Sequence, residues 1–209
     1  MEKEIIKAPS LLLLGSAGRN AGKTVAACAL IEAVKKRRFP LVALKVTSVD
    51  HSAPGCHRGG EGCGACSFEG AFVLEEQTDP SSAKDTSRLL AAGADRVFWL
   101  RAGRTSLAPG FRAFLSVLNG PAQESLILGE SNSLREVVQP GLFIMLKNKK
   151  EPVKKSAGRV AALADLTLET EGVLSPEAAK VLASRLIIEA GGPGGVRPFI
   201  PGCAPIGYR

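Results

Sequence analysis

The sequence predicts an α/β protein in which a doubly wound, mostly parallel sheet is flanked by helices. Three observations predict this class. Short continuous apolar runs, which are typical of parallel strands covered on both faces, recur along the chain. Segments with helical spacing of apolar residues alternate with these runs. The length of 209 residues and the hydrophobic fraction of 45% suit one domain, residues 1–209.

The first half of the chain is expected to hold three strands and two helices. The expected strands are 11–14, 41–44 and 96–100, and the expected helices are 24–38 and 81–94. Ser81 or Ser82 could cap the second helix. Residues 48–70 are irregular and rich in glycine and cysteine, and they are too long for a purely structural loop. We therefore treat 48–70 as a cysteine-rich insertion within the domain.

The second half continues the alternation of strands and helices. The expected strands are 125–128, 142–146 and 164–168, and the expected helices are 110–118 and 176–190. The last helix has proline in its first turn. Residues 191–209 are rich in glycine and proline, so an irregular C-terminal tail is expected there.

A glycine-rich segment joins the first expected strand to the first expected helix. The usual spacing of a phosphate-binding loop places a glycine where this chain has Ala17, but Gly15 or Gly18 can supply the turn. Backbone N–H groups at a helix start attract phosphate oxygens, Lys23 would reach the terminal phosphates, and Thr24 would ligate Mg²⁺. The alternative is a turn that binds nothing. The candidate binding residues are Gly15, Gly18, Arg19, Asn20, Ala21, Gly22, Lys23 and Thr24.

Two charged residues follow other expected strands. Lys45 would point into the same crevice as Lys23, although a solvated strand-end lysine is an equally plain interpretation. Glu130 follows the strand at 125–128 and can hold Mg²⁺ directly or through water. Asp50 is a candidate for orienting a water molecule. The expected catalytic set is Lys23, Thr24, Lys45, Asp50 and Glu130.

The cysteine-rich insertion predicts a second metal site. Cys63 and Cys66 have the C-x₂-C spacing that lets two thiolates hold one metal, and Cys56 offers a third ligand. His57, His51 or Cys203 could complete a zinc site, whereas three cysteines with an open position suit an iron–sulfur cluster equally well. Free thiols that form a reversible disulfide are the alternative. Metal binding would order this loop and couple it to nucleotide binding.

These motifs resemble the molybdopterin-guanine dinucleotide biosynthesis protein B (MobB) family of small P-loop GTP-binding proteins. The resemblance rests on the loop ending in Gly22-Lys23-Thr24, on Lys45 followed by Asp50, on the KDTSR and AGA segments at 84–88 and 92–94, and on Glu130. It implies a P-loop NTPase fold and an adaptor that binds nucleotide. Such an adaptor assists the formation of the guanine dinucleotide cofactor or its delivery to enzymes.

The segment Asn148-Lys149-Lys150-Glu151 resembles the NKxD element that reads guanine, with glutamate in place of aspartate. A carboxylate there can accept hydrogen bonds from guanine N1 and N2, and adenine has no matching pair of donors. A solvated basic loop is the alternative. Asn148, Lys149 and Glu151 are therefore candidate nucleotide contacts.

The long loop, Lys45 and Glu130 are also similar to dethiobiotin synthetase and cobyric acid synthase relatives, which use ATP to activate carboxylates. Three functions follow as expectations. The first is a slow Mg²⁺-dependent GTPase in molybdenum-cofactor maturation, with zinc or an iron–sulfur cluster at its cysteine loop. The second is an ATP-dependent synthetase or kinase. The third is a non-enzymatic metallochaperone or redox-sensing module.

The charge and amino-acid composition limit the classes of partner that we expect. The net charge is +7 and the pI is about 9.3, but aromatic residues make up only 5% and the basic residues are dispersed, so nucleic-acid binding is not expected. No run of 18 apolar residues and no secretory signal pattern is present, so we expect a cytoplasmic protein without a membrane partner. Nucleotide and molybdenum-cofactor biosynthesis proteins are the expected partners, and a homodimer is common for proteins of this size.

Overall fold

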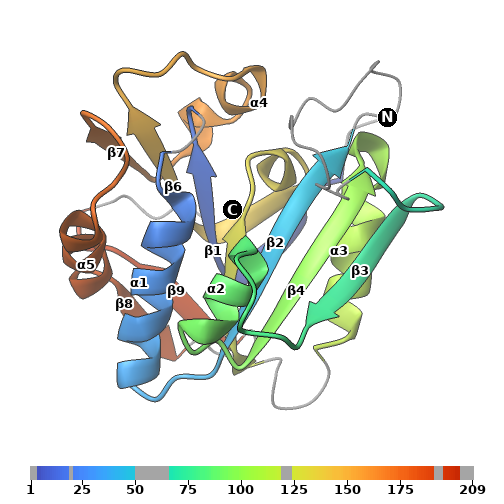
Figure 1. The fold of residues 1–209 in the computed structure, drawn as a ribbon, viewed down its shortest axis with the longest axis horizontal. Coiled ribbons are helices and arrows are strands. Elements are labelled where there is room, and N and C mark those ends of the chain that lie inside the picture. Colours follow the sequence, from blue (N-terminus) through green and yellow to red (C-terminus); the bar gives the residue numbers. More distant parts are fainter. Residues whose placement is uncertain (1–3, 19–20, 50–65, 119–123, 191–194, 203–209) are drawn as a thin grey trace.

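The computed structural model describes residues 4–18, 21–49, 66–118, 124–190 and 195–202. A seven-stranded sheet in the order β3-β4-β2-β5-β1-β6-β7 runs through these residues. All neighbouring pairs in this sheet are parallel except β3 and β4. The α/β class and the mostly parallel sheet flanked by helices are thereby confirmed, and the topology is compatible with double winding (Figure 1).

The strands and helices have the following bounds. The strands are β1 Ile6–Ser16, β2 Leu41–Val49, β3 Phe72–Gln77, β4 Arg96–Gly103, β5 Leu126–Glu130, β6 Val138–Asn148, β7 Leu166–Thr170, β8 Ile187–Ala190 and β9 Val196–Phe199. The α-helices are α1 Lys23–Lys36, α2 Asp85–Ala91, α3 Leu107–Ser116, α4 Lys155–Gly158 and α5 Pro176–Ser184. Short 3₁₀ helices are η1 Arg104–Ser106, η3 Ser133–Glu136 and η4 Ala161–Leu163.

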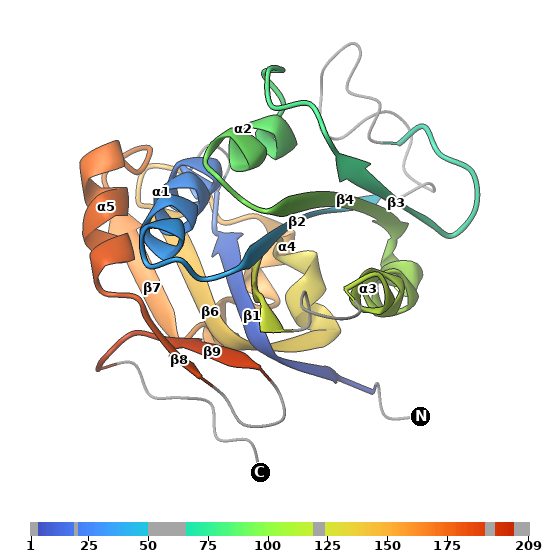
Figure 2. The same cartoon turned by 90° about the horizontal axis from the view of Figure 1, so that it is seen from below.

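The sheet separates two hydrophobic cores. Successive side chains of a strand point to opposite faces, so the apolar run 11–14 in β1 supplies both cores. Leu12 and Leu14 pack under α1 and α5, whereas Leu11 and Leu13 pack with α3 and η3. All four leucines are fully buried. Viewed from below in Figure 2, α1, α2 and α5 lie on one side of the sheet and α3 lies on the other.

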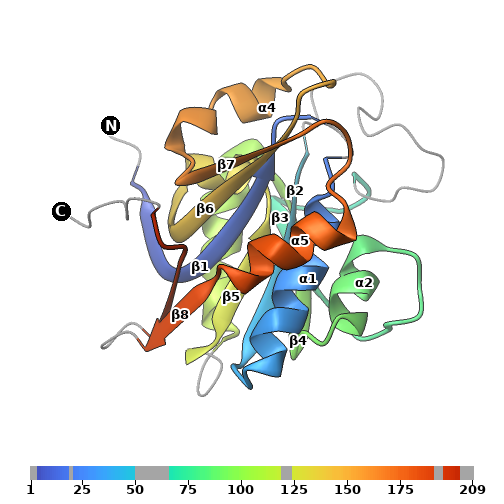
Figure 3. The same ribbon diagram turned by 90° about the vertical axis from the view of Figure 1, so that its left-hand side faces the viewer.

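Two predictions about the C-terminal part were wrong. The helix expected over 176–190 ends at Ser184, and the chain continues into β8. The tail from 191 is not irregular throughout, because β9 pairs antiparallel with β8, with Ile187 opposite Phe199. β-branched residues at 187 and 188 favour an extended backbone once a partner strand is present. Figure 3 shows α5 beside α1, with β8 leading away from it.

Further elements in the first half also differ from the expectation. β2 runs on to Val49, so the first two residues of the expected insertion are strand. The antiparallel strand β3 was not predicted at all. The helix expected over 81–94 begins at Asp85, with Lys84 rather than Ser81 or Ser82 in the N-cap position, and it ends at Ala91. Among the described residues, no helix is long and apolar enough to cross a bilayer.

Both edge strands carry ion pairs to their neighbouring strands. On β3, Glu75 pairs with Arg101 and Glu76 pairs with Arg96, each at 2.7 Å. On β7 at the other edge, Glu169 pairs with Lys147 at 2.7 Å. Each glutamate is thus paired with an arginine or lysine of the neighbouring strand, which is β4 at one edge and β6 at the other.

The backbones of β1 and β6 approach closely at Gly141. A register shift falls between Ala8 and Leu12, and a Cβ added at Gly141 would lie 2.0 Å from the carbonyl oxygen of Pro9. We expect Gly141→Ala to lower the free energy of unfolding by about 2 kcal/mol or more, measured by urea denaturation, because the two strands must move apart. Gly158→Ala is the matched control, since nothing lies within 4 Å of the new methyl group. Equal unfolding midpoints for the two variants would contradict the close approach.

Candidate functional site

Three neighbouring strands end together at one edge of the sheet. Glu130 at the end of β5 is in register with Leu14 on β1 and with Lys45 on β2. The carboxyl ends of parallel strands are where open α/β sheets bind ligands. A cavity of about 790 Å³ lies at this edge, lined mainly by polar residues of the strand ends and of the α1 and α2 starts. They include Ser16, Gly22, Lys23, Thr24, Lys45, Asp85, Arg88, Glu130, Asn132 and Lys154.

The loop between β1 and α1 is shaped by Gly22 rather than by Gly15 or Gly18. Gly22 precedes α1 with φ 85°, a left-handed conformation, and a Cβ there would lie 2.7 Å from that of Leu174. Gly15 lies within β1, and a Cβ on Gly18 would lie 2.8 Å from that of Glu151. Ala21, Gly22, Lys23 and Thr24 line the cavity, whereas Gly15 and Gly18 serve close packing beside it. Arg19 and Asn20 lie outside the described residues.

Asn132 connects the end of β5 to the end of β1. Its Oδ1 accepts a hydrogen bond from the Ser16 backbone N–H, and its Nδ2 donates to the Ser16 carbonyl, both at 2.8 Å. On the other side, the Ala17 N–H donates to Leu146 and the Ala17 carbonyl accepts from Lys154, also at 2.8 Å. The first residues of the loop are therefore fixed from both neighbouring strands before any ligand binds.

We expect Asn132→Ala to loosen this loop. Two buried backbone groups of Ser16 lose their partner, so the free energy of unfolding should fall by about 1–3 kcal/mol and nucleotide should bind more weakly. Thermal unfolding and calorimetric titration would measure the two effects. Asn132→Asp retains the acceptor and loses the donor, so it should fall between the wild type and Asn132→Ala. Wild-type behaviour of the alanine variant would contradict the role given to Asn132.

Lys23 lies folded back onto the loop. Its Nζ donates to the Ser16 Oγ at 2.6 Å, and that hydroxyl donates to the Gly18 carbonyl at 2.9 Å. Ser16 is fully buried. The lysine ammonium is thus positioned over the loop by a side chain that belongs to the preceding strand.

A buried carboxylate faces this lysine. Glu130 is only 4% exposed, and its Oε1 has no hydrogen-bond partner among the described residues. Burial raises the pKa of Glu130, and the charges of Lys45 and Lys23 only partly offset that effect. A buried carboxylate oxygen without a partner is unfavourable, so a cation in the cavity would be stabilised by it.

Asp85 brings a second carboxylate to the same place. It forms an ion pair with Lys45, and the Thr24 hydroxyl is within hydrogen-bonding reach of both Asp85 and Glu130. Burial alone would raise the pKa of Asp85, but Lys45 and Arg88 outweigh it and hold the pKa below its usual value. Asp85, Glu130 and Thr24 therefore present three oxygen donors to one cavity, the ligand type that Mg²⁺ prefers.

The structure brings together Lys23, Thr24, Lys45 and Glu130, as the sequence analysis expected. Asp50 lies outside the described residues. Asp85 and Asn132 were not predicted to contribute to the site. The KDTSR segment was a signal for Asp85, because α2 begins there and directs its first residue to the cavity.

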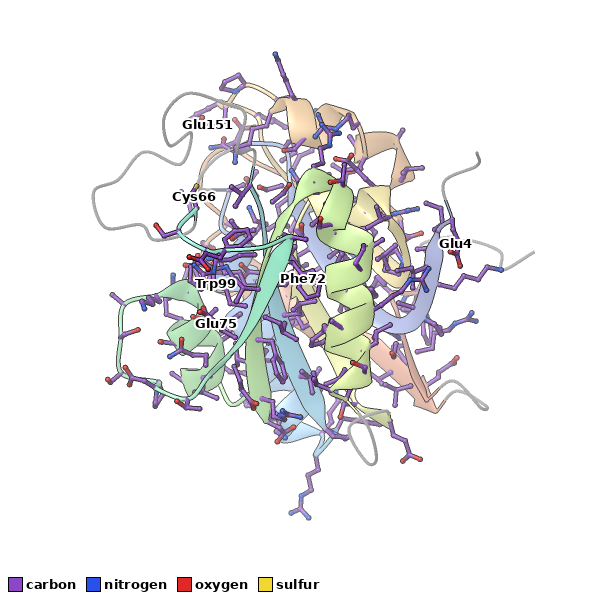
Figure 4. The ribbon with its side chains drawn as sticks, turned by 90° about the vertical axis from the view of Figure 1, so that its right-hand side faces the viewer. Glu4, Cys66, Phe72, Glu75, Trp99 and Glu151 are labelled. Carbon is purple, nitrogen blue, oxygen red and sulfur yellow. The ribbon has the colours of Figure 1, made fainter. Side chains whose placement is uncertain are left out.

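The expected guanine-reading segment lies beside the loop between β1 and α1 rather than in the cavity. β6 ends at Asn148, which is buried and accepts a hydrogen bond from the Lys150 N–H at 3.0 Å. Lys149 is exposed and pairs with Glu171 at 3.0 Å. Glu151 is exposed and packs next to Gly18. None of Asn148, Lys149 and Glu151 lines the cavity, although Glu151 lies toward the same upper edge of the sheet (Figure 4).

The expected cysteine site is described only at its last residue. Cys56, His57 and Cys63 lie outside the described residues, and Cys66 is exposed. Within the described ranges, no group of three or more His, Cys, Asp or Glu side chains could hold a metal. Cys28 on α1 donates from Sγ to the Arg88 carbonyl at 3.6 Å, and burial raises the pKa of its thiol to about 11.

The segment that follows Cys66 rests on β4. The Arg101 guanidinium lies 4.6 Å from the Trp99 ring centre and 5.7 Å from that of Phe68, and it donates to the Ser67 carbonyl at 3.4 Å. Trp99 in turn donates from Nε1 to the Thr47 hydroxyl of β2 at 3.0 Å. Figure 4 shows Cys66 above Trp99 at this side of the sheet. The C-terminal end of the insertion is therefore connected to the strand that carries Lys45.

Comparisons with known proteins identify no relative of this chain, so a function must be argued from the geometry of the site. No protein-family model matches the chain, and neither a curated protein nor a solved structure matches it.

Proposed function

We propose that the protein is a Mg²⁺-dependent P-loop nucleotide-binding protein with slow hydrolase activity. The observation that carries the proposal is the convergence of Lys23, Thr24, Lys45, Asp85 and Glu130 on one cavity at the carboxyl edge of the sheet. A strand that ends in a glycine loop and a helix beginning with Lys-Thr presents backbone N–H groups and an ammonium to phosphate oxygens.

The residues fit a magnesium ion. Thr24, Asp85 and Glu130 would hold it, and the unpartnered Glu130 Oε1 is the observation that favours a cation there. Bound magnesium would supply neutralisation of the charge on the phosphate oxygens. Lys23 would stabilise negative charge on the terminal phosphate, and Asn132 would keep the loop in its binding conformation.

On the basis of the motif resemblance, we propose that the nucleotide is GTP. We also propose that the protein acts in maturation of the molybdopterin-guanine dinucleotide cofactor. The contact between Gly18 and Glu151 supports this assignment, because it places the NKKE segment next to the loop that would hold the phosphates. Glu151 would accept hydrogen bonds from guanine N1 and N2.

Calorimetric titration of Mg²⁺-GTP and Mg²⁺-ATP tests the assignment. We expect GTP to bind at least about tenfold more tightly. Glu151→Ala should remove this preference, and Lys150→Ala, an exposed neighbour, is the matched control. A preference for ATP would remove the guanine-reading role. No binding of either nucleotide would remove the proposal as a whole.

An ATP-dependent synthetase is the second candidate. It is favoured by the rest of the cavity lining, in which Arg88, Lys154 and the hydroxyls of Ser48, Ser133 and Ser156 offer polar groups to a second, anionic molecule. Under this proposal, a small carboxylate accelerates ATP hydrolysis. Under the first proposal, a protein partner accelerates GTP hydrolysis.

We retain a metal-binding role for the cysteine insertion as a proposal. Its support is the C-x₂-C spacing and the contact of the following segment with Arg101, which connects the insertion to β2. Elemental analysis of the purified protein should find zinc or iron in about equimolar amount, and Cys63→Ser should lower it. Unchanged metal content in that variant would contradict the proposal.

A further inference from the structure

A second cavity lies on the sheet face that carries α3 and η3. Its volume is about 680 Å³, and its lining comes from η3, the start of β6, the residue before β1, and the segment after α4. It shares no lining residue with the candidate nucleotide site. Two kinds of side chain meet in it: charged groups of Arg135, Glu136 and Arg159, and apolar groups of Ile5, Val160 and Leu163.

Arg135 holds a buried charge with few partners. The residue is 7% exposed, and its Nη1 donates to the Val138 carbonyl at 3.1 Å. Its Nε has no hydrogen-bond partner in the described part of the chain. The nearest aromatic group is the Phe143 ring, with its centre 5.9 Å away. No carboxylate of the described residues forms an ion pair with this guanidinium, whose direct partners are a carbonyl and a ring.

The acidic residue in the lining is already shared by two other arginines. Glu136 accepts from Arg104 Nη2 at 2.6 Å and from Arg159 Nε at 3.0 Å. These two guanidinium groups hold the pKa of Glu136 low against the opposing effect of its partial burial. Outside the cavity, Asp165 favours the Arg135 charge without being within ion-pair distance. The lining therefore has an excess of positive charge.

The rest of the lining is apolar and partly open. Ile5 is 42% exposed and Leu163 is 43% exposed, which is high for such side chains, while Val160 is buried between them and the core. A ligand that fits this lining has one negative charge for Arg135 and a hydrocarbon part for the apolar side chains. An inorganic anion would satisfy only the first requirement, and a neutral lipid only the second.

We propose that this cavity binds a small amphipathic carboxylate of the medium-chain fatty acid type. The carboxylate takes hydrogen bonds from the Arg135 guanidinium, whose planar donors suit two oxygens of one anion. The hydrocarbon chain lies along Ile5, Val160 and Leu163. This site is separate from the nucleotide cavity and does not depend on the proposed nucleotide function.

Calorimetric titration of the full chain with sodium octanoate tests the proposal. We expect saturable binding at one site, and at least about tenfold weaker binding of octanol, which lacks the charge. Leu163→Glu should also weaken octanoate binding at least about tenfold, because it adds a carboxylate to the apolar wall. Val181→Glu is the control, since it changes an exposed apolar side chain on α5, outside the cavity, and should leave binding unchanged.

Arg135→Gln removes the charge itself and should abolish the difference between octanoate and octanol. Because Arg135 is buried, circular dichroism must first show that this variant is folded, and the exposed Leu163 variant keeps the test decisive if it is not. Absence of saturable octanoate binding, equal binding of octanol, or unchanged binding in Leu163→Glu would each overturn the proposal.

Discussion

Replacement of Lys23 by methionine should reduce nucleotide turnover by about 100-fold or more and weaken nucleotide binding. Methionine retains most of the length of the side chain but has no charge to place on the terminal phosphate. In the structure the Lys23 Nζ already lies over the loop, 2.6 Å from the Ser16 hydroxyl, so its contribution to phosphate binding requires little rearrangement. Single-turnover hydrolysis and calorimetric titration would measure the two effects.

Lys36→Met is the control for this prediction. Lys36 lies in the last turn of the same helix, is exposed, and is far along α1 from the loop. It removes the same net charge, so any loss that comes only from a lower overall charge would appear in both variants. Equal activities of Lys23→Met and Lys36→Met would contradict a phosphate-binding role for the loop.

Glu130→Gln should separate activity from stability. The variant loses a carboxylate that we assign to magnesium, so magnesium-dependent hydrolysis should fall by about 100-fold or more. Without magnesium, the same change should leave the protein equally stable or more stable by about 1 kcal/mol. The reason is that Glu130 is 4% exposed, with one oxygen unpartnered, and a neutral amide is less unfavourable there than a carboxylate.

Thermal unfolding with and without magnesium would test this separation. Wild-type protein should gain stability on addition of magnesium, whereas the variant should gain little. Glu32→Gln, an exposed position on α1, is the control and should behave as wild type in both measurements. If Glu130→Gln were less stable than the wild type without magnesium, Glu130 would stabilise the fold itself, which would contradict its assignment as a cation ligand.

The sequence allowed the positions of Lys23, Lys45 and Glu130 to be predicted because each comes shortly after a continuous apolar run. In a parallel sheet such residues lie along one edge, and here they come together because β2, β5 and β1 are neighbours. The apolar runs and the residues after them can be predicted because they depend only on the order of neighbouring residues, which a single sequence shows.

The elements that were missed depend on contacts between distant segments. Asp85 reaches the cavity because α2 begins at that residue and because the connection from β3 to β4, which contains α2, brings Asp85 opposite Lys45 of β2. Asn132 acts by binding the backbone of Ser16, which is 116 positions earlier, and no spacing rule indicates such a contact. β8 was predicted as helix because its helical spacing continues that of α5, and only pairing with β9 favours the strand.

The ion pairs on the two edge strands have a consequence for how copies of the chain meet. A strand from another copy that paired with the free edge of β3 or β7 would lie next to Glu75, Glu76 or Glu169. These glutamates already form ion pairs with the adjacent strands of their own sheet, and the added strand would have to fit beside those ion pairs. Charged edges of this kind oppose the sheet extension that leads to aggregation. A homodimer of this chain is therefore expected to form through a helical face or a loop, with the two sheets remaining separate.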